Sequence, residues 1–360
     1  MKLLTVVGAR PQFIKAAAVS RVIRSDYPGI IDEVLVHTGQ HFDHAMSEVF
    51  FTELDIPQPR YNLEIAGGPH GAMTGRMLEA IEQVLLQEGP DCLLVYGDTN
   101  STLAGALAAA KLHVPVAHVE AGLRSFNMRM PEEINRILAD RVSRLLFCPT
   151  RTAVANLYAE GLTQGVSNVG DVMFDASLHY RGMARERSSV LGRLGLLEQS
   201  YVLATCHRAE NTDDPQRLQA IIQALAELAG EMPVVLPLHP RTRNTLAALG
   251  LNAALKAVTL VEPLPFLDMI RLEQTARCIV TDSGGVQKEA FFYQVPCVTM
   301  RDETEWPETV ELGWNRLAGA SRERIVDAVL QAQRPALSGS APYGDGQASQ
   351  LIAEGLLSSL

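Results

Sequence analysis

The sequence predicts an α/β protein made of two Rossmann-like domains that face a cleft. Short apolar runs alternate with helical patterns over most of the 360 residues, and this alternation restarts near residue 201. Alternating strands and helices form parallel sheets that are covered by helices on both faces. Two sheets also suit the length of the chain, because a single hydrophobic core stops growing at about 250–300 residues.

In the first half of the chain, short apolar runs predict buried strands, and apolar residues spaced three or four apart predict helices. Between residues 73 and 87, for example, Met77, Ile81, Val84 and Leu85 fall on one helical face. The strands are expected at residues 3–7, 33–36, 92–96, 116–119 and 145–148. The helices are expected at residues 14–24, 73–87, 102–112 and 132–142.

The second half repeats this pattern after a hinge expected near residues 168–175. Its strands are expected at residues 201–205, 234–236, 258–261, 278–281 and 297–299. Its helices are expected at residues 217–229, 266–275, 285–292 and 323–331. The segment 335–346 is the richest in turn-forming residues, and a last helix is expected at residues 347–358.

Charge and composition exclude several classes of protein. The formal net charge of −10 argues against a nucleic-acid or anionic-membrane partner, which would favour a basic surface. The five cysteines show no Cys-x-x-Cys spacing, which is typical of buried thiols in a reducing compartment. The first residues do not resemble a signal peptide, and no apolar stretch approaches the ~18 residues that span a membrane. We therefore expect a cytoplasmic protein.

The segment 8–15 follows the first expected strand and combines a glycine turn with two cations, Arg10 and Lys15. Such a turn at a helix N-terminus can hold an anion. Two glycines of the dinucleotide fingerprint are missing and the P-loop pattern is absent, so neither a nicotinamide cofactor nor a P-loop nucleotide is expected. Arg10 and Lys15 could equally be solvated charges beside a plain turn.

Three carboxylates are expected at the same edge of the first sheet. Asp98 and Glu120 follow two expected strands, and Glu132 begins a helix after Pro131. Each has an ordinary alternative role. Asp98 could cap a helix, and Glu120 could pair with Arg124. Glu132 suits a helix start, where the dipole favours anions. Their coincidence favours proton transfer, because crowded carboxylates raise one another's pKa.

The second domain contains a glycine-rich segment of a different kind. Ser283, Gly284 and Gly285 lead from the expected strand 278–281 into a helix. Their backbone N–H groups could bind a phosphate. Glu289 lies about one turn further, where its carboxylate could accept hydrogen bonds from ribose hydroxyls.

Two histidines follow neighbouring strands of the second half: His207, which precedes Arg208, and His239. They bring hydrogen-bond donors to the same edge, although a single histidine at a strand end is commonly structural. No pair of His or Cys has the spacing of metal ligands, so no metal is expected. The residues alone therefore predict an anionic nucleotide on the second domain and an acidic, proton-transferring pocket on the first.

A series of motifs, in register from residue 1 to about 350, resembles the non-hydrolysing UDP-N-acetylglucosamine 2-epimerases. One such motif means little, whereas the whole series is specific. The motifs are Gly8-Ala9-Arg10-Pro11 with Lys15, Gly97-Asp98-Thr99, His118-Val119-Glu120-Ala121-Gly122-Leu123-Arg124, Pro131-Glu132-Glu133-Ile134-Asn135-Arg136, His207-Arg208, Thr281-Asp282-Ser283-Gly284-Gly285, Met300-Arg301-Asp302 and Pro342-Tyr343-Gly344-Asp345-Gly346-Gln347-Ala348.

The resemblance implies a fold of the glycosyltransferase-B type. It implies an N-terminal Rossmann-like domain with acid–base carboxylates over residues 1–170 and a C-terminal Rossmann-like domain that binds UDP over residues 171–345. A helix over residues 346–360 would pack back on the first domain. The resemblance also implies a UDP-sugar substrate, no cofactor and a homodimer.

The reaction implied by the resemblance inverts C2 of UDP-GlcNAc to give UDP-ManNAc for surface polysaccharides. A base removes the C2 proton, UDP leaves C1 to give a glycal, and UDP then re-adds. Asp98, Glu120 and Glu132 would be the acid–base carboxylates, and His207 would assist the leaving group. The residues implied for binding UDP are Arg10, Lys15, Arg208, His239, Ser283, Gly284, Gly285 and Glu289.

The sequence departs from the usual family pattern at Gln12, Ala209 and Trp306. With the segment 125–130, these departures resemble a branch that acts on UDP-2,3-diacetamido-2,3-dideoxyglucuronate, which is the alternative substrate. Further alternatives are a glycosyltransferase that uses a UDP-sugar, a hydrolysing epimerase and a UDP-sugar sensor without catalysis. In many bacterial members of the family a second UDP-GlcNAc binds as an activator; Gln40 matches the motif of that site, whereas Phe42 and Asp43 depart from it, so the sequence does not assign such a site.

Overall fold

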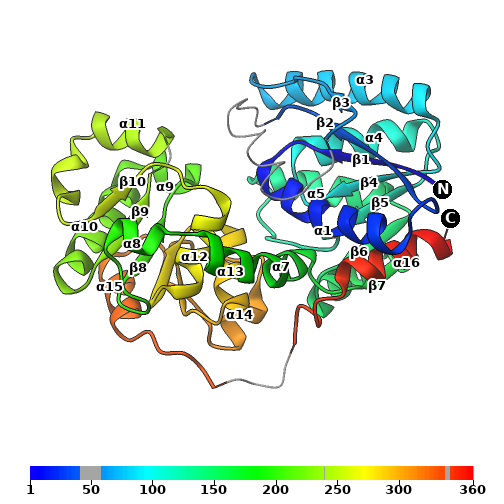
Figure 1. The fold of residues 1–360 in the computed structure, drawn as a ribbon. Coiled ribbons are helices and arrows are strands. Elements are labelled where there is room, and N and C mark those ends of the chain that lie inside the picture. The colour runs from blue at the N-terminus through cyan, green and yellow to red at the C-terminus, as the bar shows by residue number, and fades with distance from the viewer. Residues whose placement is uncertain (41–57, 239, 337–340, 360) are drawn as a thin grey trace. The chain divides into compact units, whose positions relative to one another are not determined.

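The structure is a computed structural model that describes residues 1–40, 58–238, 240–336 and 341–359. The chain divides into two compact units. Unit 1 comprises Met1–Ala176 together with Ala341–Leu360, and unit 2 comprises Ser177–Ser340. Each unit contains a parallel sheet with helices on both faces, so the predicted fold class of two Rossmann-like α/β domains is confirmed (Figure 1).

Within the described residues, unit 1 contains a seven-stranded parallel sheet in the order β3-β2-β1-β4-β5-β6-β7. Its strands are β1 (Lys2–Val7), β2 (Asp32–His37), β3 (Tyr61–Asn62), β4 (Cys92–Tyr96), β5 (Val116–Val119), β6 (Leu145–Cys148) and β7 (Val166–Asn168). Its helices are α1 (Arg10–Asp26), α3 (His70–Glu88), α4 (Asn100–Lys111), α5 (Pro131–Val142), α6 (Arg151–Ala159) and α16 (Ala348–Ser359). Helix α7 (Val172–Arg187) begins in unit 1 and continues into unit 2.

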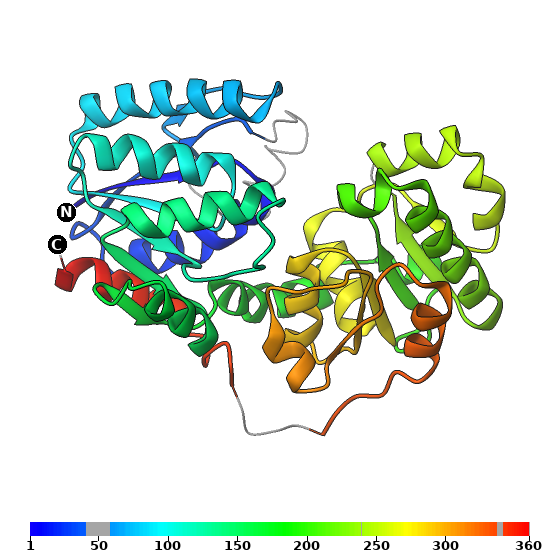
Figure 2. The same cartoon turned by 180° about the vertical axis from the view of Figure 1, so that it is seen from behind.

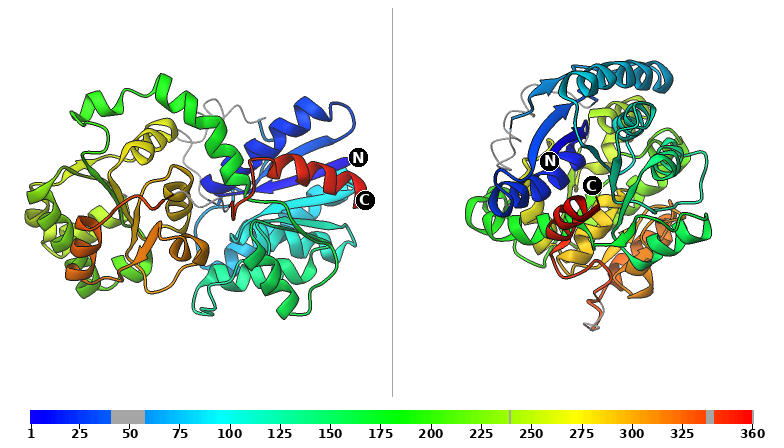
Figure 3. Two further views of the ribbon diagram at one scale, coloured as in Figure 1. Left: turned by 90° about the horizontal axis from the view of Figure 1, so that it is seen from below. Right: turned by 90° about the vertical axis from the view of Figure 1, so that its right-hand side faces the viewer.

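Helices α3, α4 and α5 lie side by side over one face of this sheet (Figure 2). Helices α1 and α16 pack against each other at the other face (Figure 3). The central strands are buried on both faces, which explains why they read as continuous apolar runs rather than as alternating patterns. One core cluster joins Val6 and Val95 of the sheet to Met77 and Ile81 of α3.

The last helix, α16, belongs to unit 1 although it follows unit 2 in the chain. The carboxylate of Asp175 accepts the first N–H groups of α16, from Ala348 at 3.2 Å and from Ser349 at 2.7 Å. The helix has no room for a side chain at Gly355, where a Cβ atom would lie 2.7 Å from the ring of Phe147. This close packing fixes α16 against the sheet.

Unit 2 contains, among its described residues, a six-stranded parallel sheet in the order β10-β9-β8-β11-β12-β13. Its strands are β8 (Val202–Thr205), β9 (Val234–Pro237), β10 (Thr259–Val261), β11 (Cys278–Thr281), β12 (Cys297–Thr299) and β13 (Asn315–Leu317). Its helices are α8 (Val190–Leu194), α9 (Ala209–Thr212), α10 (Pro215–Glu231), α11 (Pro240–Ala248), α12 (Phe266–Thr275), α13 (Gly284–Phe292), α14 (Pro307–Glu311) and α15 (Arg322–Leu330), with a 3-10 turn at Leu251–Leu255.

Helices α10 and α15 pack together over the sheet of unit 2, and their apolar faces form its main core. Helix α10 has a strong N-terminal cap, because the Asp214 carboxylate accepts the N–H groups of Gln216 and Arg217. No helix among the described residues combines the length and apolar character needed to span a membrane.

Candidate active site

Both sheets reverse their strand order beside their first strand, between β1 and β4 in unit 1 and between β8 and β11 in unit 2. Open α/β sheets bind ligands beyond the carboxyl ends of their strands, at such a switch point. The predicted residues follow these strands: Asp98 follows β4, Glu120 follows β5 and His207 follows β8. The topology therefore puts the predicted chemistry at the expected edge of each sheet.

Lys15 and Glu120 form a shielded ion pair at the switch point of unit 1. The Nζ atom of Lys15 contacts Oε2 of Glu120, and the two side chains are only 10% and 9% exposed. Both meet the backbone of Gly97, where a Cβ atom would lie 3.1 Å from Oε2 and 3.3 Å from Nζ. Gly97 also has a φ of +62°, so this position requires glycine for both space and conformation.

The alternative in which Arg124 pairs with Glu120 is wrong. The Arg124 guanidinium donates to Asp140 at 2.8 Å and to Glu160 at 2.6 and 2.8 Å. Glu120 itself has a φ of +73°, a left-handed conformation that costs a residue with a Cβ atom on the order of 1–3 kcal/mol. Such a conformation persists only where the surrounding structure enforces it.

The alternative in which Asp98 caps helix α4 is wrong. The cap of α4 is Thr99, whose hydroxyl accepts the N–H of Thr102 at 3.3 Å. The Asp98 carboxylate instead pairs with Arg136 of α5 at 2.5 Å, and its main-chain carbonyl accepts from Nδ2 of Asn135 at 2.9 Å. About a third of the Asp98 side chain is exposed, at 34%. Arg136 and Asn135 were not predicted as site residues, although both lie in the motif that begins with Pro131.

Helix α5 begins with two glutamates in different environments. Glu133 is buried, and its carboxylate accepts the N–H groups of Ser125 and Phe126 at 3.0 and 2.9 Å. Glu133 therefore fixes the loop before the helix. Glu132, the predicted acid–base residue, is half-buried in the same first turn and so keeps contact with solvent.

Gln12 was also missed by the sequence analysis as a site residue. Its Oε1 accepts the N–H groups of Gly8 and Ala9 at 2.8 and 3.0 Å. Its Nε2 donates to the carbonyl of Tyr96 at 2.7 Å and to the hydroxyl of Thr102 at 2.9 Å. Gln12 thus ties the turn after β1 to the end of β4 across the switch point. A glutamate has no N–H to donate to the Tyr96 carbonyl, so the amide fits this position.

In unit 2, the buried carboxylate of Asp282 holds the segment of His207 and Arg208. It accepts the N–H groups of both residues at 3.0 Å and Nδ2 of Asn211 at 3.2 Å. Nδ1 of His207 lies 3.5 Å from Oδ1 of Asp282, and 44% of the His207 side chain is exposed. Asp282 was not predicted as a site residue, because its role depends on partners about 70 positions earlier in the chain.

The first turn of α13 combines donors with one carboxylate. Ser283 caps the helix, since its hydroxyl accepts the N–H of Val286 at 3.5 Å. A Cβ atom on Gly284 would lie 3.4 Å from Oε2 of Glu305, 3.6 Å from Nε1 of Trp306 and 4.0 Å from Nη2 of Arg208. The guanidinium and the indole N–H are donors at a helix start, where the dipole favours an anion, while the Glu305 carboxylate is already paired with Arg301.

Other predicted and unpredicted residues surround this turn. Gly285 is exposed, and Glu289 is half-buried on the next turn of α13. Trp306, which was noted only as a departure from the family pattern, lies over Lys288, whose Nζ is 4.0 Å from the ring centroid. Glu305 joins Arg301 through hydrogen bonds of 2.9 and 3.0 Å. These contacts fix Glu305 and Trp306 beside Gly284.

Several predicted features cannot be placed. Arg10 begins α1, but its side chain lies outside the described residues. His239 lies outside them as well, and so do Phe42 and Asp43 of the expected departure from the activator motif. The structure therefore does not test the roles expected of these residues.

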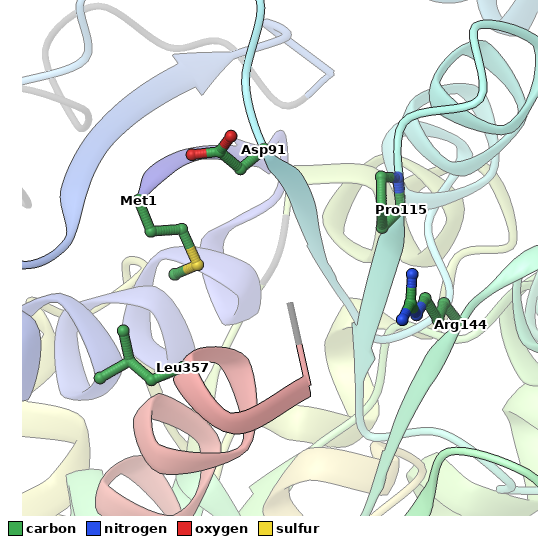
Figure 4. A pocket seen from close by; sticks show the side chains of 5 residues that line it. All are labelled: Met1, Asp91, Pro115, Arg144 and Leu357. Carbon is green, nitrogen blue, oxygen red and sulfur yellow. The ribbon is translucent and has the colours of Figure 1, made fainter.

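A surface pocket in unit 1 lies at the opposite edge of the sheet from the candidate site. Its lining residues come just before strands rather than after them: Met1 before β1, Asp91 before β4 and Arg144 before β6 (Figure 4). Ligands of parallel α/β sheets bind at the carboxyl ends of the strands, so this pocket is not the candidate active site.

Two Rossmann-like units with polar and anion-binding residues at their switch points define the class of nucleotide-sugar enzymes with the glycosyltransferase-B type of fold. The family model described as UDP-N-acetylglucosamine 2-epimerase matches residues 26–357. The chain belongs to the UDP-N-acetylglucosamine 2-epimerase family, and it is therefore an isomerase.

Two curated relatives cover nearly the whole chain. The UDP-2,3-diacetamido-2,3-dideoxy-D-glucuronate 2-epimerase of Pseudomonas aeruginosa is 56% identical over 98% of this chain and 99% of its own length. The UDP-N-acetylglucosamine 2-epimerase of Methanocaldococcus jannaschii is 42% identical over 98% of both chains. The predicted family and reaction class are thus confirmed, and these epimerases give no support to the alternative of a glycosyltransferase.

Two solved structures resemble the whole chain. The crystal structure of the Methanocaldococcus jannaschii enzyme in complex with UDP-GlcNAc and UDP has a TM-score of 0.92 at 42% identity and covers 100% of both chains. The Neisseria meningitidis enzyme bound to UDP-GlcNAc has a TM-score of 0.91 at 31% identity, also over 100% of both chains.

Proposed function

We propose that the protein inverts C2 of a UDP-linked 2-acetamido sugar by eliminating and re-adding UDP. A carboxylate removes the C2 proton while the bond between C1 and the UDP oxygen breaks, which leaves a glycal with a C1–C2 double bond. The UDP oxygen then re-forms the bond to C1, and a proton is delivered to the other face of C2. No oxidant or reductant is needed. The observation that carries this proposal is the meeting of Glu120 and Lys15 at Gly97, directly before Asp98.

The acid–base roles fall to Asp98, Glu120 and Glu132. Inverting one carbon requires proton transfer at both faces, so more than one carboxylate is needed. The two best-described carboxylates differ in their access to water, since Asp98 is 34% exposed and Glu120 is 9% exposed. We infer that Asp98 exchanges its proton with solvent, while Glu120 acts in a shielded environment.

The binding of UDP falls to unit 2. Ser283, Gly284 and Gly285 offer the N–H groups of the first turn of α13 to the pyrophosphate, and Arg208 adds a positive charge beside Gly284. Glu289 binds the ribose hydroxyls. His207 stabilises the charge that grows on the departing UDP oxygen, because its exposed ring is held by Asp282.

The remaining predicted ligands complete the charge balance of the nucleotide. Lys15 and Arg10 neutralise phosphate charge, and His239 contributes a donor. Lys15 and Arg10 are supported by their places in the first sequence motif, and His239 by its position after an apolar run of the second half.

We propose UDP-2,3-diacetamido-2,3-dideoxy-D-glucuronate as the preferred substrate. The relative named for this activity is 56% identical, whereas a relative named as a UDP-N-acetylglucosamine 2-epimerase homolog is 49% identical and one named as a UDP-N-acetylglucosamine 2-epimerase is 42% identical. Conversion of UDP-GlcNAc to UDP-ManNAc is the second candidate, because solved relatives at TM-scores of 0.92 and 0.91 carry UDP-GlcNAc. Both reactions use the same chemistry at C2 and suit the synthesis of surface polysaccharide precursors.

The deciding experiment is proton NMR of each nucleotide sugar with the purified protein in D2O. Loss of the C2 proton signal and growth of the C2-inverted product, with no net release of UDP, is the expected result. A higher kcat/KM for the diacetamido uronate supports the proposed substrate, and a higher value for UDP-GlcNAc reverses the order. If neither nucleotide sugar loses its C2 proton signal, the proposed function is overturned. Release of UDP only with an added acceptor or with consumption of water would indicate a transferase or a hydrolysing enzyme.

We also propose a cytoplasmic homodimer. All five cysteines are buried free thiols, as expected in a reducing compartment.

The homodimer is supported by exposed apolar side chains. Two of them lie one turn apart on α5, Ile134 and Leu138, which are 41% and 40% exposed, and Phe126 and Met128 in the preceding loop are also exposed. Light scattering after size exclusion should show a dimer, and Leu138→Glu should shift it towards monomer. A wild-type monomer would refute this state.

A further inference from the structure

One buried carboxylate, that of Asp140 on α5, holds the chain on both sides of Glu120. Its Oδ1 lies 2.7 Å from Nδ1 of His118, two residues before Glu120. Its Oδ2 accepts the N–H of Gly122, two residues after Glu120, at 3.1 Å. Asp140 and His118 are both fully buried. A single side chain therefore connects α5 to the segment that presents the proposed acid–base residue.

The ring of His118 lies between two acceptors. Nε2 lies 2.7 Å from the carbonyl oxygen of Gly97, and a carbonyl oxygen can only accept, so Nε2 carries a proton and donates. Nδ1 lies 2.7 Å from Oδ1 of Asp140. Burial favours the neutral acid at Asp140, but the hydrogen bonds and charges of His118 and Arg124 outweigh it and lower the pKa of Asp140 below its usual range. The ring therefore connects the Gly97 backbone to the Asp140 carboxylate.

The Asp140 carboxylate is fixed from a further side by Arg124. The Arg124 guanidinium donates to Oδ2 of Asp140 at 2.8 Å and to Glu160 at 2.6 Å. Oδ1 of Asp140 therefore faces His118, while Oδ2 accepts from both Arg124 and the Gly122 N–H. With both oxygens engaged, the carboxylate cannot turn without breaking one of these contacts.

The same contacts fix the backbone around the proposed catalytic groups. The Gly97 carbonyl that His118 holds belongs to the residue against which Glu120 and Lys15 meet. The Gly122 N–H that Asp140 holds belongs to a residue with a φ of +79°. A Cβ atom on Gly122 would lie 2.3 Å from the carbonyl oxygen of Ala153, so this segment has no room to shift.

We propose that His118 and Asp140 are positioning residues of the epimerase, which clamp the chain at residues 97, 118 and 122 so that Glu120 keeps its left-handed backbone and presents its carboxylate at Gly97. This inference rests on the acid–base role proposed for Glu120. Neither residue touches the reacting atoms, because both are fully buried and act through backbone groups. A clamp of this kind supplies the preorganisation that proton transfer at carbon requires.

Steady-state kinetics of Asp140→Asn test the clamp. Asparagine keeps the shape but removes the charge and one of the two acceptor oxygens that hold His118, Gly122 and Arg124. We expect kcat per folded molecule to fall about 10- to 100-fold, since small displacements of catalytic groups cost this much, while KM and UDP affinity stay within about two-fold. The matched control is Glu160→Gln, which removes a charge from the outer end of the same group, and we expect its kcat to stay within about two-fold. A wild-type kcat in Asp140→Asn, with only its stability reduced, would overturn the proposal.

A second measurement needs no folded Asp140 variant. In wild-type protein labelled with 15N-histidine, Nε2 of His118 should carry a proton that exchanges slowly with water, because it is buried and donates to the Gly97 carbonyl, and His118→Gln identifies its signal. An unprotonated Nε2 at His118 would overturn the clamp. This result is separable from the proposed function: if the wild-type protein exchanges no C2 proton, the proposed function fails and the catalytic meaning of the clamp fails with it, while the hydrogen bond from His118 to Gly97 is still decided by NMR.

Discussion

Replacing Glu120 by glutamine should lower turnover by at least two orders of magnitude and also destabilise the fold, and these two effects can be separated. Glu120 pairs with Lys15 where both side chains are about nine-tenths buried. Glutamine removes the negative charge and leaves the ammonium group of Lys15 without compensation. Breaking a buried ion pair from one side typically costs about 3–5 kcal/mol, because one charge stays buried and unpaired.

The loss of the acid–base group should act on the chemical step alone. General acid–base catalysis contributes roughly 10²- to 10⁴-fold, so kcat and the rate of C2 proton exchange should fall by this factor. UDP affinity should change little, because the proposed UDP ligands of α13 and the His207 segment lie in unit 2. The double variant Glu120→Gln with Lys15→Met contains no buried charge at this position. It should recover most of the lost stability and none of the activity.

The assay combines urea unfolding, for the free energy of unfolding, with NMR exchange of the C2 proton in D2O. The expected order of stability is wild type, then the double variant, then Glu120→Gln. Near-normal turnover in Glu120→Gln would remove the acid–base role. A double variant no more stable than Glu120→Gln would show that the buried charge of Lys15 is not the cause of the loss.

Three further predictions follow from single contacts. Gly97→Ala places a Cβ atom 3.1 Å from the Glu120 carboxylate at a φ of +62°, so kcat should fall about 10- to 100-fold and unfolding free energy by about 1–2 kcal/mol; unchanged kinetics would contradict this. Burial lowers the pKa of His37 to about 4, so the unfolded chain binds the proton first as pH falls from 6.5 to 4, and at most about 3 kcal/mol of the free energy of unfolding is lost. In urea titrations over this pH window, the free energy of unfolding of His37→Gln should change less with pH than that of the wild type. An equal change would refute the assignment. In Gly355→Ala the new methyl group pushes against the ring of Phe147, so the free energy of unfolding should fall by about 1–3 kcal/mol, as measured by calorimetry. The kcat at 25 °C should not change. An unchanged Tm would show that α16 shifts freely.

The sequence was informative where burial is continuous. The central strands of both sheets appear as uninterrupted apolar runs, and the structure contains each of them within a residue or two of its expected bounds. The strands β3, β7 and β13 were not predicted. Each has only two or three residues, lies at the edge of its sheet and contains polar side chains, so it gives no apolar run to detect.

The part of the candidate site that directly follows the strands could be predicted from the sequence. Asp98 and Glu120 could be chosen because carboxylates directly after apolar parallel strands are unusual, and the structure brings Glu120 together with Lys15 at Gly97. Their partners could not be chosen in this way. Arg136 and Asp282 act through residues 38 and 75 positions away, and only the fold determines which distant segments meet.

The return of α16 to unit 1 has a consequence for how the protein is made. Unit 2 is an insertion in the sequence of unit 1, since residues 177–340 separate α16 from the rest of its own unit. On the ribosome, unit 2 is synthesised completely before Ile352, Ala353 and Leu356 can cover α1 and its sheet. The nascent chain therefore exposes an apolar face of its first unit until α16 has been added. Chaperones that bind such surfaces have their longest opportunity at this face, and a stop codon shortly before α16 would leave it uncovered permanently.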